Sequence, residues 1–441
     1  MPSPAQSDQR AIARQIMQTA LQAVNPAVAL KNHLRANPFT LANIGAARGR
    51  IFVVGAGKAA APMTAAVAEI FGDKIAGGLV VVKYNHYDDQ TLAAARQVNI
   101  EIIEAGHPVP DQAGLNAAAQ IVNLLKTVTA DDVVICLLSG GASALLTLPV
   151  SGLSLADVQT VTRQLLAAGA DIHQINTVRK HLSAVKGGQL ARTAAPAAVY
   201  TFILSDVMGD ALPDIGSGPT VPDPTTFAEA WAVLAQYELT AKLPAAVIKH
   251  LQAGRNQTLP ETPKPDDPLF ARDHHAIIGS NRLAAQAAVE AARAAGFAPR
   301  LLTTWLEGEA REVGKVLAAL AKGAGNRPAC LVLGGETTVT LRGSGKGGRN
   351  QEMALAAAIA LDGWPNILIA CLGTDGTDGP TDAAGAFAAG DTVARARAQG
   401  LDPLDYLRRN DAYYFFTALD DLIMTGPTQT NVNDLALIFA W

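Results

Sequence analysis

Short apolar runs followed by glycine-rich turns recur along the chain, and a helical pattern follows most of these turns. Residues 51–54 form the first such run, with a turn at 55–58 and a helical pattern over 59–71. Residues 132–138 form another run, which a turn at 139–143 follows. A buried strand, a glycine turn and a helix make half of a βαβ unit, so this alternation predicts an α/β fold.

The same pattern predicts further strands and helices in both halves of the chain. Between the halves, residues 255–269 hold four prolines and few apolar side chains, which is typical of a linker. We therefore predict two domains, over residues 1–254 and 270–441, joined by this linker. The further strands are expected at 78–82, 199–204, 275–279, 299–303, 329–333, 366–372 and 435–440, and the further helices at 8–35, 113–126, 154–192, 282–295 and 353–361.

Composition sets limits on this picture. Of the 441 residues, 49% are hydrophobic and 17% are charged, which is typical of a well-buried globular protein. The net charge of −4 does not favour nucleic-acid binding. The amino terminus lacks the apolar region of a signal peptide, and no apolar run approaches the ~18 residues of a membrane span. Cys136, Cys330 and Cys371 lie in apolar runs without metal-type spacing, as expected in a reducing cytoplasm.

The most glycine-rich stretch of the chain covers residues 334–352. It holds six glycines between Gly334 and Gly348, and a helical pattern opens at Arg349. Glycines let backbone N–H groups approach a ligand closely, and a helix N-terminus favours anions. The stretch therefore predicts a cradle for a polyanion; the alternative is a glycine-rich hairpin with a strand at 337–341. In the cradle, the candidate ligand-binding residues are Gly335, Glu336, Thr337, Gly347, Gly348 and Asn350.

The turn after the first strand carries Gly55, Gly57 and Lys58. Gly55-x-Gly57-x-x-Ala60 matches the permissive dinucleotide fingerprint, so the two glycines are candidate nucleotide-binding residues. The next strand ends in Lys83, where a nicotinamide-binding domain would place an acidic residue for the ribose. Lys58 stands at a helix start, where the dipole disfavours cations, and this favours a functional role over an ordinary surface lysine.

The turn at 139–143 combines hydroxyl groups with glycines, which predicts a second anion-binding nest. The serine-hydrolase pattern G-x-S-x-G does not fit it, because Leu145 stands at the last position. Further along, Arg179, Ser183 and Lys186 share one face of the helical pattern, which indicates either a solvated face or contact with a ligand. The candidate substrate-binding residues are Ser139, Gly140, Gly141, Ser143 and Arg179.

Acidic residues follow two of the predicted strands. Asp206 comes after the strand at 199–204, and the glycine-rich loop that follows the strand at 366–372 could hold a cation through Asp375 or Asp378. Carboxylates at strand ends suit Mg²⁺, and we take Asp206 and Asp375 as the candidate metal ligands. The loop around Asp375 lacks the spacing and the last glutamate of an EF-hand. His107, in a proline-stiffened turn, is as open to a structural role as to a catalytic one.

In order and spacing, these motifs resemble those of the bacterial glycerate 2-kinases with a carboxyl-terminal MOFRL domain, which older naming often labels hydroxypyruvate reductases. The resemblance covers nearly the whole chain. It implies an amino-terminal Rossmann-like α/β domain with a parallel sheet and helices on both faces, a smaller α/β (MOFRL) domain, and an active site in the cleft between them. The motifs are GAGKAA, GHPVPD, SGGASAL, INTVRKHLSAVKGG, LSDVMGD, GSGPTVPD, GGETTVT, GGRNQE, GTDGTDGP and TGPTQTNVNDL.

The resemblance implies ATP-dependent phosphorylation of D-glycerate to 2-phosphoglycerate with Mg²⁺, and makes Lys58 and Arg349 the catalytic cations. On this interpretation the 334–352 cradle, Gly55 and Gly57 bind the nucleotide, and the 139–143 nest with Arg179 holds the glycerate carboxylate. The alternatives are an NAD(P)H-dependent hydroxypyruvate reductase, which the glycine fingerprint favours, and a sugar-acid binding protein. The sequence leaves open the stereochemistry, the position of transfer, which loop holds glycerate and which ATP, the general base, and whether the chain forms a homodimer.

Overall fold

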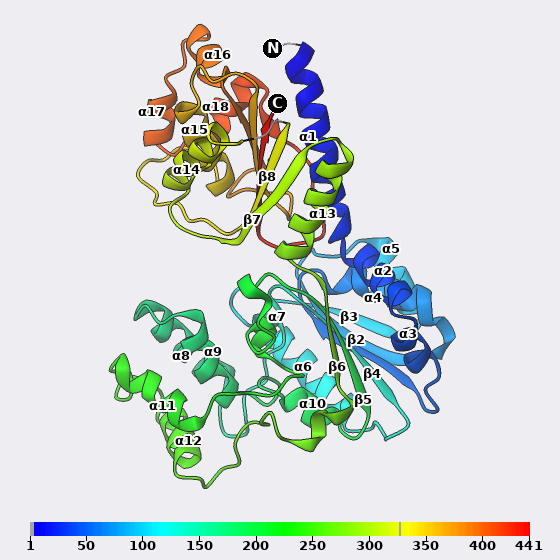
Figure 1. The fold of residues 1–441 in the computed structure, drawn as a ribbon. Helices are drawn as coiled ribbons and strands as arrows, with labels where there is room; N and C mark the ends of the chain where they lie inside the picture. Colours follow the sequence, from blue (N-terminus) through cyan, green and yellow to red (C-terminus); the bar gives the residue numbers. More distant parts are fainter. Residues whose placement is uncertain (1–3, 326–327) are drawn as a thin grey trace. The chain divides into compact units, whose positions relative to one another are not determined.

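The computed structural model describes residues 4–325 and 328–441, which fold into two units (Figure 1). The first unit is the continuous segment Pro26–Ile278. The second unit combines Gly279–Trp441 with the amino-terminal segment Met1–Asn25. Each unit is built around its own six-stranded sheet. The two-domain α/β architecture predicted from the sequence is therefore confirmed.

The sheet of the first unit has the strand order β3-β2-β1-β4-β5-β6. Strands β1 to β5 pair in parallel with their neighbours in this order. This order is that of the dinucleotide-binding Rossmann folds, in which the chain reverses direction across the sheet between β1 and β4. The strands are β1 (Ile51–Ala56), β2 (Ile75–Lys83), β3 (Ile100–Ala105), β4 (Val133–Ser139), β5 (Ala198–Leu204) and β6 (His274–Gly279).

Helices cover both faces of this sheet, as predicted (Figure 1). On one face α4 packs beside α2 and α5, and on the other α6 packs beside α7 and α10. Four further helices, α8, α9, α11 and α12, enclose an apolar cluster of their own. The bounds are α2 (Pro26–Ala36), α3 (Pro38–Gly45), α4 (Ala60–Phe71), α5 (Asp89–Gln97), α6 (Gln112–Leu125), α7 (Ala142–Leu145), α8 (Leu155–Ala167), α9 (Ile172–His181), α10 (Gln189–Ala194), α11 (Phe227–Gln236) and α12 (Ala245–Arg255).

The sheet of the second unit is mixed, with the order β11-β10-β9-β12-β8-β7. The last strand, β12, runs antiparallel to both β8 and β9, so its amino end lies beside their carboxyl ends. In this register Asp434 is the Cα partner of both Gly335 and Gly373. The strands are β7 (Ala298–Leu306), β8 (Ala329–Gly335), β9 (Ile367–Gly373), β10 (Gly385–Ala389), β11 (Leu422–Ile423) and β12 (Asp434–Ala440).

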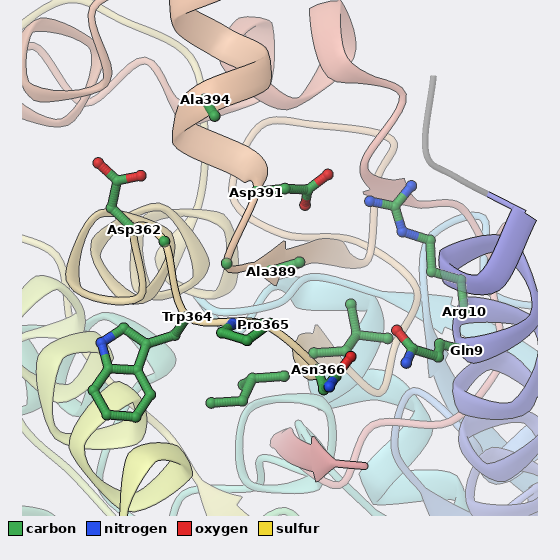
Figure 2. A pocket seen from close by; sticks show the side chains of 13 residues that line it. Gln9, Arg10, Asp362, Trp364, Pro365, Asn366, Ala389, Asp391 and Ala394 are labelled. Carbon is green, nitrogen blue, oxygen red and sulfur yellow. The ribbon is translucent and has the colours of Figure 1, made fainter.

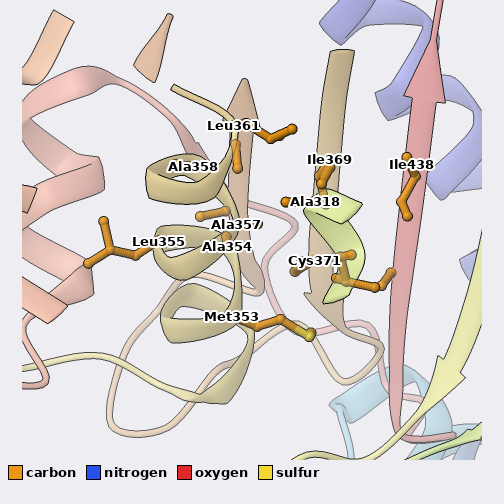
Figure 3. Packing of buried hydrophobic residues seen from close by; sticks show 14 of the residues in the cluster. Ala318, Met353, Ala354, Leu355, Ala357, Ala358, Leu361, Ile369, Cys371 and Ile438 are labelled. Atoms are coloured by element: carbon orange, nitrogen blue, oxygen red, sulfur yellow. The ribbon is translucent and has the colours of Figure 1, made fainter. Parts of the chain in front are cut away.

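Small side chains let the helices of the second unit pack closely on its sheet. The alanine-rich helix α15 is buried along nearly its whole length and packs on β9 and β10. Its apolar side chains belong to one cluster with Ile369 and Cys371 of β9 and Ile438 of β12 (Figure 3). A Cβ added to Gly314 on α14 would lie only 2.3 Å from the carbonyl oxygen of Met353 on α15. The helices are α1 (Pro4–Ala23), α13 (Asn281–Ala294), α14 (Ala310–Lys322), α15 (Arg349–Ala360), α16 (Thr392–Ala398), α17 (Pro403–Arg408) and α18 (Ala412–Leu419).

The boundaries of the units differ from the predicted 1–254 and 270–441. The proline-rich segment 255–269 packs on the first unit, where the N–H of Asp223 donates to the carbonyl of Pro263 at 2.8 Å. Strand β6, predicted to open the second domain, joins the first sheet beside β5. At the other end of the chain, α1 packs against α13 and so belongs to the second unit. Prolines in a segment thus marked an irregular backbone, but not a free linker.

Three predicted elements differ in detail. The predicted helix over 8–35 is two helices, because Pro26 begins α2 and cannot continue the hydrogen bonding of α1. The helical region 154–192 contains α8, α9 and α10. The predicted strand at 337–341 is wrong: only an isolated bridge between Glu309 and Thr338 forms there.

The burial predicted for the cysteines is confirmed, since Cys136, Cys330 and Cys371 are free and buried. None of the described helices combines the length and hydropathy that a membrane span requires.

Replacing Gly314 by alanine is expected to destabilise the second unit. The added Cβ would collide with the backbone of α15, so the two helices would have to move apart. Overpacking of this kind costs about 1–3 kcal/mol. Urea unfolding followed by tryptophan fluorescence measures the loss, because Trp305, Trp364 and Trp441 all lie in this unit.

Gly325→Ala is the matched control for this substitution. Among the described residues, no atom lies within 4 Å of a Cβ added at Gly325, so the free energy of unfolding should change by no more than about 0.5 kcal/mol. An equal loss of stability in both variants would show that the close packing of α14 on α15 is not the cause.

Candidate active site

The turns after β1 and β4 mark the candidate site of the first unit. These neighbouring strands stand where the strand order reverses, and in open α/β sheets ligands bind outside the carboxyl ends of the strands at such a point. The turn after β1 carries Gly57 and Lys58, and the turn after β4 carries Gly140 and Gly141. Two predicted ligand-binding loops therefore meet at the position that the topology favours.

The two turns are locked together by close contacts. The Ser139 hydroxyl accepts a hydrogen bond from the N–H of Ala59 at 2.9 Å, and the N–H of Lys58 donates to the carbonyl of Gly140 at 2.9 Å. Gly57 has φ of 141°, and a Cβ there would lie 2.0 Å from the Ser139 hydroxyl. Ser139 thus holds the turn of Lys58 with its side chain, and its predicted contact with substrate stays a prediction.

Lys58, His107 and Asp206 surround the glycines of the second turn. A Cβ on Gly141 would lie 3.0 Å from the His107 ring and 3.6 Å from Cγ of Lys58, and one on Gly140 would lie 2.2 Å from the Asp206 carboxylate. Burial and the charge of Lys58 lower the pKa of His107 to about 4, so its ring is neutral at pH 7. Burial raises the pKa of Asp206, although the charge of Lys58 opposes this. Perturbed groups gathered at one turn are typical of a functional site.

Two buried cations lie behind the same turn. Arg179 Nη2 and Lys186 Nζ both donate to the carbonyl of Ser143, at 3.3 and 2.7 Å. The Nε of Arg179 is buried and has no hydrogen-bond partner among the described residues. Burial lowers the pKa of Arg179 to about 10. The Ser143 hydroxyl lies 2.7 Å from that of Ser217, so the side chain of Ser143 is already positioned from within the protein.

The helical face predicted for Arg179, Ser183 and Lys186 does not exist, because α9 ends at His181. The chain turns back after this helix, and Ser183 uses its hydroxyl to accept from the N–H groups of Val185 and Lys186. Arg179 and Lys186 still converge, but through a turn instead of a helix. The functional grouping was therefore visible in the sequence, although its geometry was not.

In the second unit Arg349 is held by two carboxylates. Its Nε and Nη2 donate to the two oxygens of Asp434 at 2.5 and 2.9 Å, and Nη1 lies 3.0 Å from Glu336. Burial alone would lower the pKa of Arg349, but these carboxylates outweigh burial and raise it. The guanidinium is therefore a permanent cation in a fixed orientation. Asp434 can do this because the register of β12 places it beside Gly335.

The start of α15 is capped by a carboxylate. Helix α15 begins at Arg349, as predicted, but the N–H groups of Asn350 and Gln351 donate to Asp378 at 3.1 and 2.8 Å. A Cβ on Gly348 would collide with Asp378, which explains a glycine at this position. Burial raises the pKa of Asp378 to about 6. The helix N-terminus that the sequence offered to phosphate is thus occupied by a side chain of the protein itself.

The other predicted residues of the second unit differ in how they are engaged. The Oγ1 of Thr337 and the Oδ1 of Asn350 are buried without a hydrogen-bond partner among the described residues, so both retain an unsatisfied polar atom. Glu336 is partly exposed and pairs with Arg349. Asp375 accepts from the N–H and hydroxyl of Thr377, at 3.0 and 3.2 Å, and so closes its own turn. Gly335, with φ of 151°, packs against Leu306, while Gly347 lies against Ala412.

The predicted metal ligands do not form a cluster. In the described part of the chain, no group of three or more His, Cys, Asp and Glu side chains is arranged to hold a metal ion. Asp206 belongs to the first unit and Asp375 to the second. Of the two, Asp206 fits a metal–nucleotide complex better, because its carboxylate lies near the turn of Lys58 whereas Asp375 is engaged with Thr377. Mg²⁺ typically needs only one or two protein carboxylates when phosphates supply the other ligands.

A pocket of about 420 Å³ lies at the other end of the second sheet (Figure 2). It is formed where β9 begins and β10 ends, whereas Asp434, Gly335 and Gly373 stand at the opposite strand ends. No predicted site residue lines it. Its lining residues are Gln9, Arg10, Asp362, Gly363, Trp364, Pro365, Asn366, Ile367, Leu368, Ala389, Gly390, Asp391 and Ala394.

Sequence reasoning missed Asp434 and Asp378 as the partners of Arg349 and of α15. Each acts on residues 27 or more positions away, so no local pattern could pair them. The sequence does hold a signal for Asp434, because this aspartate stands between a polar loop and the apolar run of the last strand. Lys186 was noticed only as part of a helical face. Its burial could not be inferred, since a buried lysine without a carboxylate is rare.

Comparison with known proteins gives a consistent answer. Residues 12–252 match the family described as a domain of unknown function, DUF4147, and residues 329–434 match the MOFRL family. The chain is 41% identical over 432 residues to the D-glycerate 2-kinase of Thermotoga maritima, with 97% of both chains covered. It is 43% identical over 437 residues to a protein of Agrobacterium vitis with the provisional name hydroxypyruvate reductase, with 97% of this chain and 94% of that one covered.

The structure is also similar to a crystal structure of the glycerate kinase of Thermotoga maritima. The TM-score is 0.88 at 40% identity, and the match covers 99% of this chain and 100% of that one. Because the match covers both units, the similarity is not limited to the separate motifs but extends over the whole fold. The chain therefore belongs to the glycerate 2-kinase family and carries its DUF4147 and MOFRL domains.

Proposed function

We propose that the protein phosphorylates D-glycerate to 2-phosphoglycerate with ATP. The observation that carries this proposal is the gathering of Lys58, His107 and Asp206 over two interlocked glycine turns at the point where the strand order reverses. The relatives named D-glycerate 2-kinase supply the substrate and the reaction. Phosphoryl transfer asks a protein mainly to position groups and to stabilise charge, and these turns offer both.

The substrate carboxylate is proposed to bind beside Arg179. This guanidinium has a buried N–H without a partner, and no carboxylate pairs with it among the described residues. An unpaired buried donor is costly, and a carboxylate ligand would satisfy it with a charge-assisted hydrogen bond. Gly140, Gly141 and Ser143 would line the same subsite, because Arg179 donates to the Ser143 carbonyl.

Each unit offers a glycine-rich segment as a candidate for nucleotide binding. In the first unit Gly55 and Gly57 would bring the backbone close to the phosphates. In the second unit Thr337 and Asn350 would contribute their unsatisfied polar atoms. The other candidate residues of this segment are Gly335, at the end of β8, Glu336, which pairs with Arg349, and Gly347 and Gly348, which precede α15. Lys58 in the first unit and Arg349 in the second unit are each proposed as catalytic cations.

Mg²⁺ would be held by Asp206 together with the ATP phosphates. When bound, the ion would neutralise negative charge on the phosphates and orient them. Asp206 and His107 also remain the two candidates for the base that accepts the hydroxyl proton. His107 can serve because it is neutral at pH 7, and Asp206 because burial makes its carboxylate more basic. The three buried free cysteines support our proposal of a reducing, cytoplasmic location.

The reductase alternative is distinguished by one pair of assays on the purified chain. D-Glycerate with Mg-ATP should yield ADP and 2-phosphoglycerate, identified by phosphorus NMR, and excess EDTA should abolish the reaction. Hydroxypyruvate with NADH or NADPH should show no loss of the reduced cofactor. The opposite pair of results would establish the reductase. Turnover of neither substrate, with glycerate binding intact, would indicate a binding protein.

Lys58→Ala is expected to lower kcat by about 10²–10³ or more, because it removes a cation that stabilises the transition state. The fold should survive, since the turn is held by the backbone of Lys58 and not by its ammonium group. Steady-state kinetics with D-glycerate and Mg-ATP measures the effect. Lys249→Ala, at an exposed position on α12, is the control and should keep normal kinetics. A Lys58→Ala enzyme with near-normal kcat would exclude Lys58 as a catalytic residue.

Arg349→Lys is expected to lose most of kcat while keeping much of its affinity for ATP. Lysine retains the charge but cannot make the planar double contact that Arg349 makes with Asp434, so the cation loses its orientation. Kinetics and thermal unfolding on the same sample separate orientation from stability. Asp434→Asn is the companion variant, since it weakens the same pair without touching Arg349. A lower melting temperature with unchanged kcat in both variants would mean that the pair is purely structural.

A further inference from the structure

Lys186 is almost completely buried in the first unit. Its Nζ donates to two backbone carbonyls, Ser143 at 2.7 Å and Leu146 at 2.8 Å. Arg179 donates to the same Ser143 carbonyl at 3.3 Å. Two cations thus share one oxygen atom in the turn that follows β4. Neither has a carboxylate partner among the ion pairs of the described residues.

Lys180 shows how this chain normally buries a lysine. It lies six positions earlier, is equally buried, and pairs with the buried carboxylate of Asp223 at 3.3 Å. Asp223 is in turn satisfied by Thr225 and Thr262. A buried charge with a counterion of this kind contributes to the folded structure, whereas one without a counterion is costly to bury. Lys186 therefore lacks the carboxylate partner that offsets the burial of Lys180.

The surroundings of Lys186 disfavour its protonated form. Burial lowers the pKa of Lys186 well below its ordinary value, and Arg179 on α9 lowers it further. The remaining neighbours are uncharged: the carbonyls of Ser143 and Leu146, and the hydroxyl of Ser183, which accepts from the Lys186 N–H. An anion bound near the Ser143 turn would reverse this balance, because opposite charge favours the protonated amine.

We propose that Lys186 is a positioning residue of the glycerate subsite, which fixes the Ser143 turn together with Arg179 and supplies positive charge that is balanced only when the substrate carboxylate is bound. The inference rests on the function proposed above. It predicts that glycerate binding and protonation of Lys186 are coupled. Glycerate should therefore bind with uptake of a proton at alkaline pH, and its KM should rise as the pH rises, while KM for ATP should stay flat.

Lys186→Met tests the charge with a side chain of similar length. The full chain carrying it should keep its ATP KM and show KM for D-glycerate raised roughly 10- to 100-fold, as expected when one buried charge contact is lost. The rise of KM with pH should disappear. The melting temperature should stay equal or increase, since an uncompensated buried charge has been removed. Unchanged glycerate KM in an active Lys186→Met enzyme would overturn the proposal.

The control is the double variant Lys180→Met with Asp223→Asn. It removes the neighbouring buried pair without leaving either charge alone, and its KM for D-glycerate and the pH dependence of that KM should match those of the wild type. An equal rise of KM in this control would show that any change in this region disturbs the site, and would overturn the specific role of Lys186.

Wild-type protein gives a second test that does not require Lys186→Met to fold. Calorimetry of D-glycerate binding at alkaline pH, in two buffers with different heats of ionisation, counts the protons taken up. Uptake that approaches one proton supports the proposal, and binding without uptake overturns it. Wild-type protein that binds D-glycerate but transfers no phosphate from ATP would refute the proposed function and leave the coupling measurable, so the two failures are distinguishable.

Discussion

The contact between the turns after β1 and β4 is the constraint on which the candidate site depends. Parallel neighbours end at the same edge of a sheet, so these turns must share one small space. They fit because Gly57 has no side chain to meet Ser139, and because each turn satisfies backbone or hydroxyl groups of the other. Lys58 is placed beside Gly141 by this backbone contact alone. No ion pair in the described part of the chain holds its ammonium group.

Charge is balanced very differently in the two units. In the second unit Arg349 is bound by Asp434 and Glu336 before any ligand arrives, and its fork geometry is fixed. In the first unit Arg179 and Lys186 meet only uncharged oxygen atoms. A fixed cation costs no reorganisation when charge develops nearby, which suits stabilisation of a transition state. Uncompensated cations instead store electrostatic free energy that an anionic ligand can release on binding.

Much of the fold could be predicted from the sequence, because most strands are continuous apolar runs bounded by glycine. Strand β3 was missed since Glu101 and Glu104 interrupt its apolar pattern, and β10 since it is short and largely alanine. The first sheet gained β6 against expectation, because the prolines before it suggested a free linker. Pairing with β5 is a tertiary interaction, and no local composition reports it.

Candidate site residues could be selected from the sequence where they stand in a local motif, but their distant partners could not. Lys58, Gly57 and Arg349 were selected from glycine turns and helix starts. The sequence could not show that Asp434 holds Arg349 across 85 positions. It also could not show that Asp378 takes the helix N-terminus expected to bind phosphate.

The position of Asp378 at the start of α15 bears on how the 334–352 cradle would work under the proposed function. A buried carboxylate at the start of α15 repels a phosphate that approaches the same N–H groups, so α15 itself offers little direct binding. What the segment retains is a fixed guanidinium and the unsatisfied polar atoms of Thr337 and Asn350. Asp378 also rigidifies the helix start from which Arg349 projects. Close packing on Asp378 then explains the glycine at 348, and close packing on Arg409 and Asp411 explains those at 343 and 345. Under the proposed function, the chemistry of the segment rests on the orientation of one side chain, Arg349.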